Sequence, residues 1–106
     1  MEEIVSVLEF RGKLTYGREC EQRYQELCAF LARGSRSFLL DLRHVPDIDS
    51  TGIGFLVTCL TTVARAGGKL YLASPSASVL HSLVLTRLDH LFPAFESVDA
   101  ALSVTK

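Results

Sequence analysis

The residues best placed to do chemistry form a short segment, rich in carboxyl and hydroxyl groups, in the middle of the chain. Asp47 and Asp49 precede Ser50 and Thr51 there. A long run with apolar residues at helical spacing follows directly, so we expect Ser50 to cap the start of a helix. A helix N-terminus presents free N–H groups and partial positive charge, and can therefore accommodate a phosphate. The pattern makes Ser50 a candidate for phosphorylation.

Taken alone, these residues leave plainer interpretations open. Ser is a preferred N-cap residue, so Ser50 could serve only to start the helix. Gly52 and Gly54 could serve internal packing, or could let another protein approach the backbone closely. Asp41 and Asp49 could be recognised by a kinase, whereas Asp is also common at turns and strand ends. Of these two carboxylates, Asp49 is the stronger candidate for a functional role.

The spacing does not support other kinds of site. A nucleophile elbow requires Gly two residues before its Ser, and Ile48 occupies that position. The glycines at 52 and 54 are too few for a dinucleotide fingerprint, and no lysine follows them at P-loop spacing. The three histidines have no metal-ligand spacing with the cysteines. We therefore expect no catalytic residues, no metal and no cofactor, and expect that the chain is not an enzyme.

Composition limits the class of protein. The chain has 106 residues, of which 48% are hydrophobic and 22% charged, and its net charge is −1. This balance suits a single globular domain over residues 1–106, and it offers no basic block for nucleic acid and no run long enough to span a membrane. Three cysteines without a C-x-x-C pair indicate a reducing compartment, and no signal peptide is visible. We expect a cytoplasmic protein.

The elements that must position these residues alternate in type. Strands are expected at residues 4–10, 38–42, 69–73 and 91–95. Helices are expected from Arg18, from Ser50 and after the loop 74–76, with a last one capped by Ser97 and running through Leu102. This alternation predicts an α/β domain with a largely parallel or mixed sheet of four to five strands and about four helices.

Helical spacing also predicts which side chains face the core. In the first helix Cys20 and Cys28 should be buried and unpaired. In the second helix the expected apolar stripe consists of Ile53, Leu56, Val57, Leu60, Val63 and Ala64. In the third, the side chains expected to point inward are Val79, Leu80, Leu83 and Leu88.

The segment 41–54 resembles the STAS family, specifically its anti-sigma factor antagonists. In that family a strand ending in Asp-Leu leads to an Asp-Ser-x-Gly-Leu/Ile-Gly motif. Residues 49–54, Asp-Ser-Thr-Gly-Ile-Gly, match it position by position. Residues 67–73 and 83–92 also look like later elements of the family, so the resemblance covers about residues 4–102.

The resemblance implies a function as a partner switch. An unphosphorylated member binds an anti-sigma factor that is also an ATP-dependent serine kinase, and so frees a sigma factor for transcription. Phosphorylation of the Ser after the Asp breaks the complex, and a serine phosphatase restores it. Carried onto this chain, the phosphorylated residue is Ser50, and the partner-binding surface consists of Asp49, Thr51, Gly52, Ile53 and Gly54.

Two alternatives remain at this stage. The first is a STAS subunit with a scaffolding role in a signalling or lipid-transport assembly, in which Ser50 is never modified. The second, more distant alternative is a small hydrolase, which the missing elbow glycine opposes.

The chain also departs from the family's pattern. Family members often have one more N-terminal strand. Thr15 stands where the family usually has Asp, which removes a charge near the partner surface. Thr51 stands where the family usually has Ser or Ala, and we expect it to fill the first helical turn rather than to be a second phosphorylation target.

Overall fold

Four strands form one sheet in which spatial order follows chain order. The computed structural model describes residues 5–105. Its strands are β1 (Val5–Arg11), β2 (Ser37–His44), β3 (Lys69–Ala73) and β4 (Ala94–Phe95), and they lie in the order β1-β2-β3-β4. All three pairings are parallel, and the β1–β2 register shifts between Glu9 and Arg11. The expected α/β class is confirmed, with a parallel sheet rather than a mixed one.

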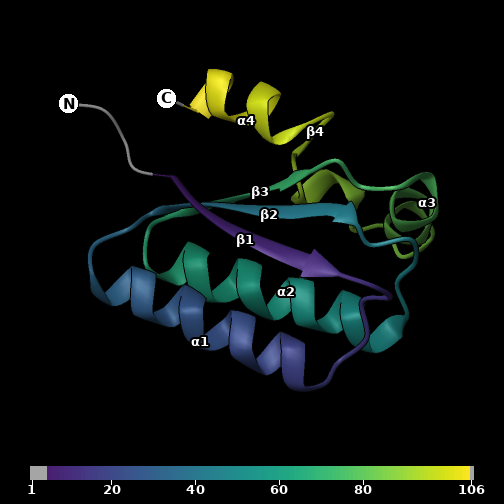
Figure 1. Cartoon of the computed structure of the whole chain (residues 1–106), viewed down its shortest axis with the longest axis horizontal. Coiled ribbons are helices and arrows are strands. Elements are labelled where there is room, and N and C mark those ends of the chain that lie inside the picture. Colours follow the sequence, from purple (N-terminus) through teal and green to yellow (C-terminus); the bar gives the residue numbers. More distant parts are fainter. Residues whose placement is uncertain (1–4, 106) are drawn as a thin grey trace.

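This strand order decides where the helices lie. Crossovers between parallel strands are right-handed, so a sheet that grows in one direction carries its connecting helices on one face. The first two of these, α1 (Arg18–Ala32) and α2 (Ser50–Arg65), pack side by side against that face, and α3 (Ala77–Leu85) contributes to the same core (Figure 1). The last helix, α4 (Val98–Thr105), lies across the opposite face.

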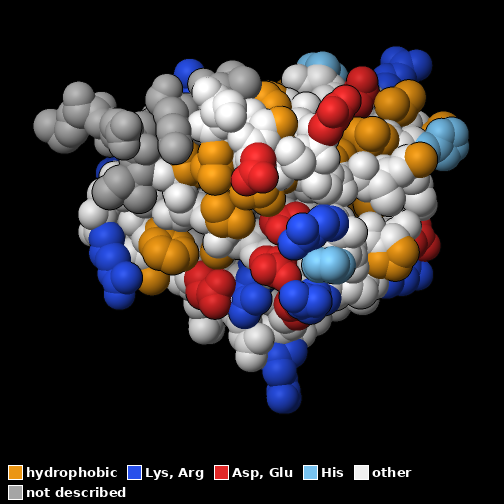
Figure 2. Space-filling model, turned by 45° about the horizontal axis from the view of Figure 1, so that its top comes forward, with side chains coloured by type: hydrophobic (Ala, Val, Ile, Leu, Met, Phe, Trp, Pro, Cys, Tyr) orange, Lys and Arg blue, Asp and Glu red, His pale blue; other side chains and the backbone are white. Residues whose placement is uncertain are grey.

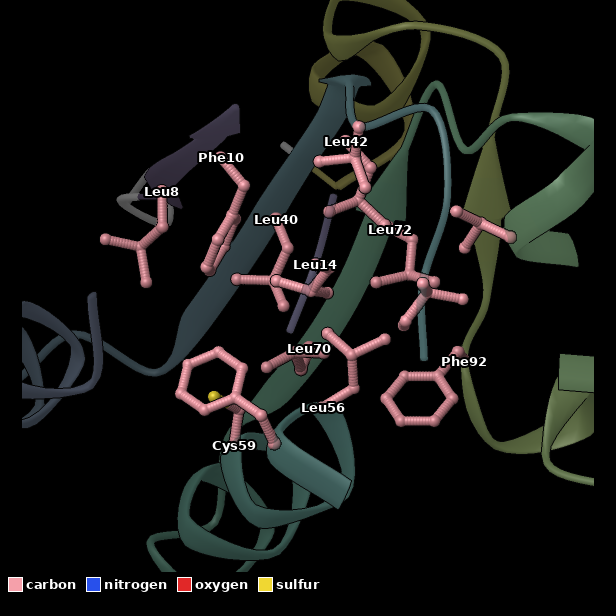
Figure 3. Packing of buried hydrophobic residues seen from close by; sticks show 14 of the residues in the cluster. Leu8, Phe10, Leu14, Leu40, Leu42, Leu56, Cys59, Leu70, Leu72 and Phe92 are labelled. Carbon is pink, nitrogen blue, oxygen red and sulfur yellow. The ribbon is translucent and has the colours of Figure 1, made fainter. Parts of the chain in front are cut away.

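The two faces carry cores of very different size. Side chains of β2 alternate, so that Phe38, Leu40 and Leu42 point toward α1 and α2, where the strand side chains meet Leu56 and Cys59 of α2 (Figure 3). On the other face, Leu39 joins Ala73 and Ala101 in a smaller cluster. Because β2 is covered on both faces, its residues 37–42 are all buried, and four of these six are apolar.

The buried stripe of α2 is rotated from the expected one. The buried residues are Gly52, Phe55, Leu56, Cys59 and Val63. Of the predicted set, Leu56 and Val63 are buried, whereas Ile53, Val57 and Leu60 are half-buried and Ala64 is exposed. The predicted stripe lies to one side of the buried one because the prediction considered only aliphatic residues. A glycine, an aromatic residue and a cysteine line the side that contacts the sheet.

The segment after β3 departs further from expectation. Val79 and Leu83 are buried as predicted and Leu88 is half-buried, but Leu80 is exposed. The strand expected at 91–95 is reduced to Ala94–Phe95, because residues 89–91 form a turn of 3₁₀-helix. Pro93 lies just before this short edge strand, and its carbonyl accepts a hydrogen bond from the Leu72 N–H at 2.9 Å.

The chain ends differ little from the prediction. Ile4, the expected first residue of β1, lies outside the described residues, and the strand begins at Val5. Ser97 caps α4 as predicted, since its hydroxyl accepts a hydrogen bond from the Ala100 N–H at 3.0 Å. That helix extends beyond the predicted end at Leu102.

The cysteines are free thiols, as the sequence predicted. Cys20 and Cys59 are buried, whereas Cys28 is only half-buried, so its predicted burial was wrong. Burial raises the pKa of Cys59 to about 12. Burial is also the main cause that raises the pKa of Cys20. Both buried thiols are therefore uncharged at neutral pH and act as small apolar groups in the core.

Two negative findings apply to the described residues. Among residues 5–105, no helix is long and apolar enough to cross a membrane. Within the same range, no three His, Cys, Asp or Glu side chains are grouped closely enough to hold a metal ion.

Candidate functional site

The segment 49–54 lies where two loops are joined at the carboxyl ends of β1 and β2. Leu14 of the β1–α1 loop forms a parallel bridge with Ile48 of the β2–α2 loop. The Leu14 N–H donates to the Asp47 carbonyl at 2.9 Å, and the Asp49 N–H donates to the Leu14 carbonyl at 3.2 Å. Leu14 and Ile48 are both buried. Paired backbones and buried side chains therefore fix the position at which α2 begins.

The N-cap of α2 is Asp49, not Ser50 as the sequence indicated. The Asp49 carboxylate accepts hydrogen bonds from the Gly52 N–H at 2.9 Å and from the Thr51 hydroxyl at 2.7 Å. Ser50 is the first helical residue, and its side chain is exposed. Asp and Ser are equally good caps, and the buried anchor at Ile48 places Asp49 at the cap position. The Ser50 hydroxyl makes no hydrogen bond within the described residues.

Thr51 does more than fill the first turn, which corrects the expectation. Its hydroxyl donates to Asp49, accepts a hydrogen bond from the Tyr16 N–H at 2.9 Å, and lies 3.2 Å from the Thr15 hydroxyl. The side chain thus connects the β1–α1 loop to the start of α2. Nothing in the local sequence signals this role, because the two partners lie 35 and 36 positions away.

The same hydrogen bonds set the charge beside Ser50. The Thr15 hydroxyl, followed by the Thr51 hydroxyl and the Gly52 N–H, lowers the pKa of Asp49 far below its usual range. A carboxylate that accepts several hydrogen bonds is stabilised in its ionised form. Asp49 is therefore fully charged at neutral pH, and its charge lies one residue from a free hydroxyl.

The two glycines of the segment have opposite environments. A Cβ placed on Gly52 would lie 2.1 Å from the Leu14 carbonyl oxygen, so this glycine permits close packing inside the molecule. It is buried, and the expectation that a partner approaches its backbone does not fit this position. Gly54 is exposed, and a Cβ there would meet no atom within 4 Å. Only Gly54 offers bare backbone to another protein.

The remaining predicted residues lie apart from this cluster or at its margin. Ile53 is half-buried and packs against the main core. Asp41 is buried on the opposite face of the sheet, where its carboxylate accepts a hydrogen bond from the Arg43 N–H at 3.1 Å. Its alternation with Leu40 and Leu42 along β2 carries it away from α2. Asp41 is therefore not part of the surface around Ser50.

A groove that the sequence did not reveal adjoins the segment. It has a volume of about 690 Å³ and lies between α1 and α2. Thr51 and Gly54 line it together with residues from α1 and the preceding loop, so it continues the surface that carries Ser50. Residues this far apart in sequence give no local signal of a shared groove.

The chain was compared with families of known proteins and with solved structures. Residues 2–101 match the STAS domain family. A Thermotoga neapolitana protein named "Putative anti-sigma factor antagonist TM1081 homolog" is 36% identical over 73 residues, which are 69% of this chain and 65% of that protein. The matched region thus spans slightly less than two thirds of that relative's length.

Solved structures extend the likeness to nearly the whole chain. The crystal structure of the corresponding Thermotoga maritima protein superposes with a TM-score of 0.80 at 27% identity, covering 95% of this chain and 86% of that one. The unphosphorylated anti-sigma factor antagonist SpoIIAA (TM-score 0.76, 17% identity, 98% and 90% covered) has the same fold. So does a Wolinella succinogenes sulfate transporter family protein (0.78, 22%, 95% and 84%). The parallel sheet, its helices and the match over residues 2–101 show that this chain belongs to the STAS domain family.

Proposed function

We propose that this chain is a cytoplasmic anti-sigma factor antagonist that is switched by phosphorylation of Ser50. In the unmodified state it binds an anti-sigma factor that is also a serine kinase, and the kinase transfers phosphate to Ser50. The phosphorylated chain dissociates, and a serine phosphatase returns it to the binding state. The chain acts as ligand and substrate in this cycle, without catalysis of its own and without contact with nucleic acid or membrane.

The free Ser50 hydroxyl is the observation that supports this proposal most strongly. Asp49 takes over the capping role, so the Ser50 hydroxyl is exposed and unoccupied. A serine that capped the helix would have to give up its hydrogen bond before it could accept a phosphate. Because Ser50 already stands in the first turn, modification leaves every described hydrogen bond of the joined loops in place.

The electrostatics around Ser50 support release after modification. A phosphate adds about −1.5 to −2 charges at neutral pH. The helix N-terminus stabilises that charge, so folding should survive. A partner that covers this surface would have to desolvate the phosphate next to the ionised Asp49, and an unpaired buried charge weakens a complex strongly.

The proposal is tested with serine kinases encoded near the gene of this chain. Each is purified and incubated with the chain and ATP, and phosphate is located by mass spectrometry. We expect modification at Ser50 and none in Ser50→Ala, which should still bind the kinase. Ser50→Asp should keep its stability and bind at least tenfold more weakly.

Ser76→Ala is the matched control, because it removes a hydroxyl from another helix start at the same edge of the sheet. It should be phosphorylated at Ser50 like the unaltered chain. Two results together would reject switching in favour of a scaffolding role: no phosphate on Ser50 with any of these kinases, and equal binding by Ser50→Asp.

A further inference from the structure

The groove between α1 and α2 has aromatic walls and a single acidic group. Three rings line it, those of Tyr16, Tyr24 and Phe55, and Glu21 is the only charged residue in the lining. Phe55 is held by an edge-on contact with Phe10, with ring centroids 5.9 Å apart. The Tyr24 hydroxyl lies 2.9 Å from the Thr62 hydroxyl and ties α1 to α2. The rings of Phe55 and Tyr24 are therefore held by contacts that exist without any ligand.

Glu21 forms no ion pair within the described part of the chain, and the nearest basic residue before it on α1 is Arg18, three positions away. The Glu21 carboxylate accepts a hydrogen bond from the Tyr16 hydroxyl at 3.3 Å. The charge of Glu21 is the main cause that raises the pKa of Tyr16. Glu19 adds a second negative charge in the first turn of α1. The groove is thus an apolar slot whose lining carries one carboxylate, that of Glu21.

This combination favours one kind of side chain. An arginine guanidinium is flat and always charged; it stacks on aromatic rings and forms paired hydrogen bonds with a carboxylate. Its aliphatic stem can lie along apolar walls. The groove lies between α1 and α2 and is open to solvent, which suits a side chain that enters from a docked surface.

We infer that this groove binds an arginine side chain of the protein partner that covers Ser50. The inference rests on the proposed function, since Thr51 and Gly54 line the groove and lie in the same helical turn as Ser50. A partner seated on that turn reaches the groove without further movement.

The first test measures the affinity of a kinase that binds the unaltered chain. Glu21→Gln keeps the shape of the side chain and removes its charge, and Thr58→Met places a larger side chain at the groove wall. Each should weaken binding about tenfold or more. Glu96→Gln removes the same charge from an exposed residue between β4 and α4, and should bind like the unaltered chain. Unchanged affinity in both groove variants, with Ser50 still phosphorylated, would overturn the inference and leave the proposed function standing.

The second test needs no kinase and decides the inference if none binds. Acetyl-arginine amide is titrated into the ¹⁵N-labelled chain, and acetyl-citrulline amide, which has nearly the same shape without the charge, serves as the comparison. We expect concentration-dependent amide shifts around Glu21, Tyr24 and Thr58 with arginine, and loss of those shifts in Glu21→Gln. Equal shifts with citrulline, or arginine shifts located elsewhere, would show that the groove does not recognise a guanidinium.

Discussion

Two helices begin at the same edge of the sheet with a serine near the start, and the two serines differ completely. The Ser76 hydroxyl accepts a hydrogen bond from the Val79 N–H at 3.2 Å and donates to the Pro46 carbonyl at 3.3 Å. The Ser76 side chain is half-buried and its hydroxyl is engaged in these two hydrogen bonds. The Ser50 side chain is exposed, and its hydroxyl makes no hydrogen bond within the described residues. The difference arises because an aspartate caps α2 and a serine caps α3. A hydroxyl becomes available for modification where another residue performs the structural task.

The largest expected effect is a difference in folding stability between alanine variants of the two glycines at the start of α2. Gly52→Ala forces a methyl group against the Leu14 carbonyl and should lower the free energy of unfolding by about 3 kcal/mol. Gly54→Ala, in the same turn but in open space, should raise it by up to about 1 kcal/mol. Urea denaturation followed by circular dichroism measures both. Similar stability in the two variants would mean that α2 is not pressed against Leu14.

A smaller effect is expected when the connection between the loops is removed. Thr51→Val keeps the shape of the side chain but leaves the Tyr16 N–H and Asp49 without its hydroxyl. We expect a loss of about 1.5 kcal/mol and faster hydrogen exchange at the Tyr16 amide. Thr58→Val is the control, because the Thr58 hydroxyl bonds only to its own helix at Gly54. If exchange at Tyr16 changed equally in both variants, Thr51 would not be what holds the loop.

The serine comparison itself predicts a difference between two alanine variants. Ser76→Ala removes an N-cap and should cost about 1 kcal/mol of folding stability. Ser50→Ala removes a hydroxyl without a partner and should change stability by less than about 0.5 kcal/mol. Thermal and urea denaturation of the pair at neutral pH provide the measurement. If Ser50→Ala lost more stability than Ser76→Ala, the result would show that Ser50, and not Asp49, caps α2.

The smallest expected effect is a change in how folding stability depends on pH in the acidic range. The pKa of Asp49 is lowered in the folded state, so its contribution to folding is complete above the unfolded value of about 4 and is lost as the pH falls below it. Asp49→Asn should therefore be less stable than the unaltered chain at neutral pH, and the difference should shrink as the pH falls toward 2. Solvent around this half-buried carboxylate keeps the effect small.

Asp47→Asn provides the comparison for that measurement. The Ile48 N–H, followed by the Ser78 hydroxyl, lowers the pKa of Asp47, in a smaller network than the one around Asp49. The stability difference between Asp47→Asn and the unaltered chain should also shrink as the pH falls, but it should be smaller than the difference for Asp49→Asn. The reverse order would make Asp47, whose carboxylate contacts Ser78 of α3, the carboxylate that contributes more to stability.

Sequence patterns predicted the larger elements well, because long periodic segments and glycine stops carry local information. Neighbouring residues were enough to predict where α1 and β3 start and that Ser97 caps α4. The failures have long-range causes. The cap moved to Asp49 because Ile48 is anchored against Leu14, and Leu80 is exposed because α3 packs through Val79 and Leu83 alone.

The candidate site was predictable in location but not in internal organisation. The motif placed a serine beside an aspartate at the start of a helix. It could not show that Gly52 packs internally, that Thr51 binds the Tyr16 backbone, or that α1 and α2 enclose a groove. Each of these depends on the β1–α1 loop, which is more than 30 residues away.

The exposed apolar side chains of α3 contrast with the mixed charges elsewhere on the surface. Leu80, Val84 and Leu85 are all exposed, and hydrophobic side chains gather over α3 at the right of Figure 2. The centre of the same view holds acidic, basic and histidine side chains close together. This face therefore has no large field of one sign, in keeping with the net charge of −1.

The register shift in β1 bears on how the edges of the sheet meet other chains. An open sheet has two edges, and an exposed edge strand can recruit another chain and begin aggregation. At one edge, the irregularity between Glu9 and Arg11 interrupts the ladder, and those two side chains form an ion pair at 2.6 Å. At the other edge, β4 offers only two residues after a proline. An irregular strand with a charged pair at one border and a two-residue strand at the other are both features that disfavour strand addition.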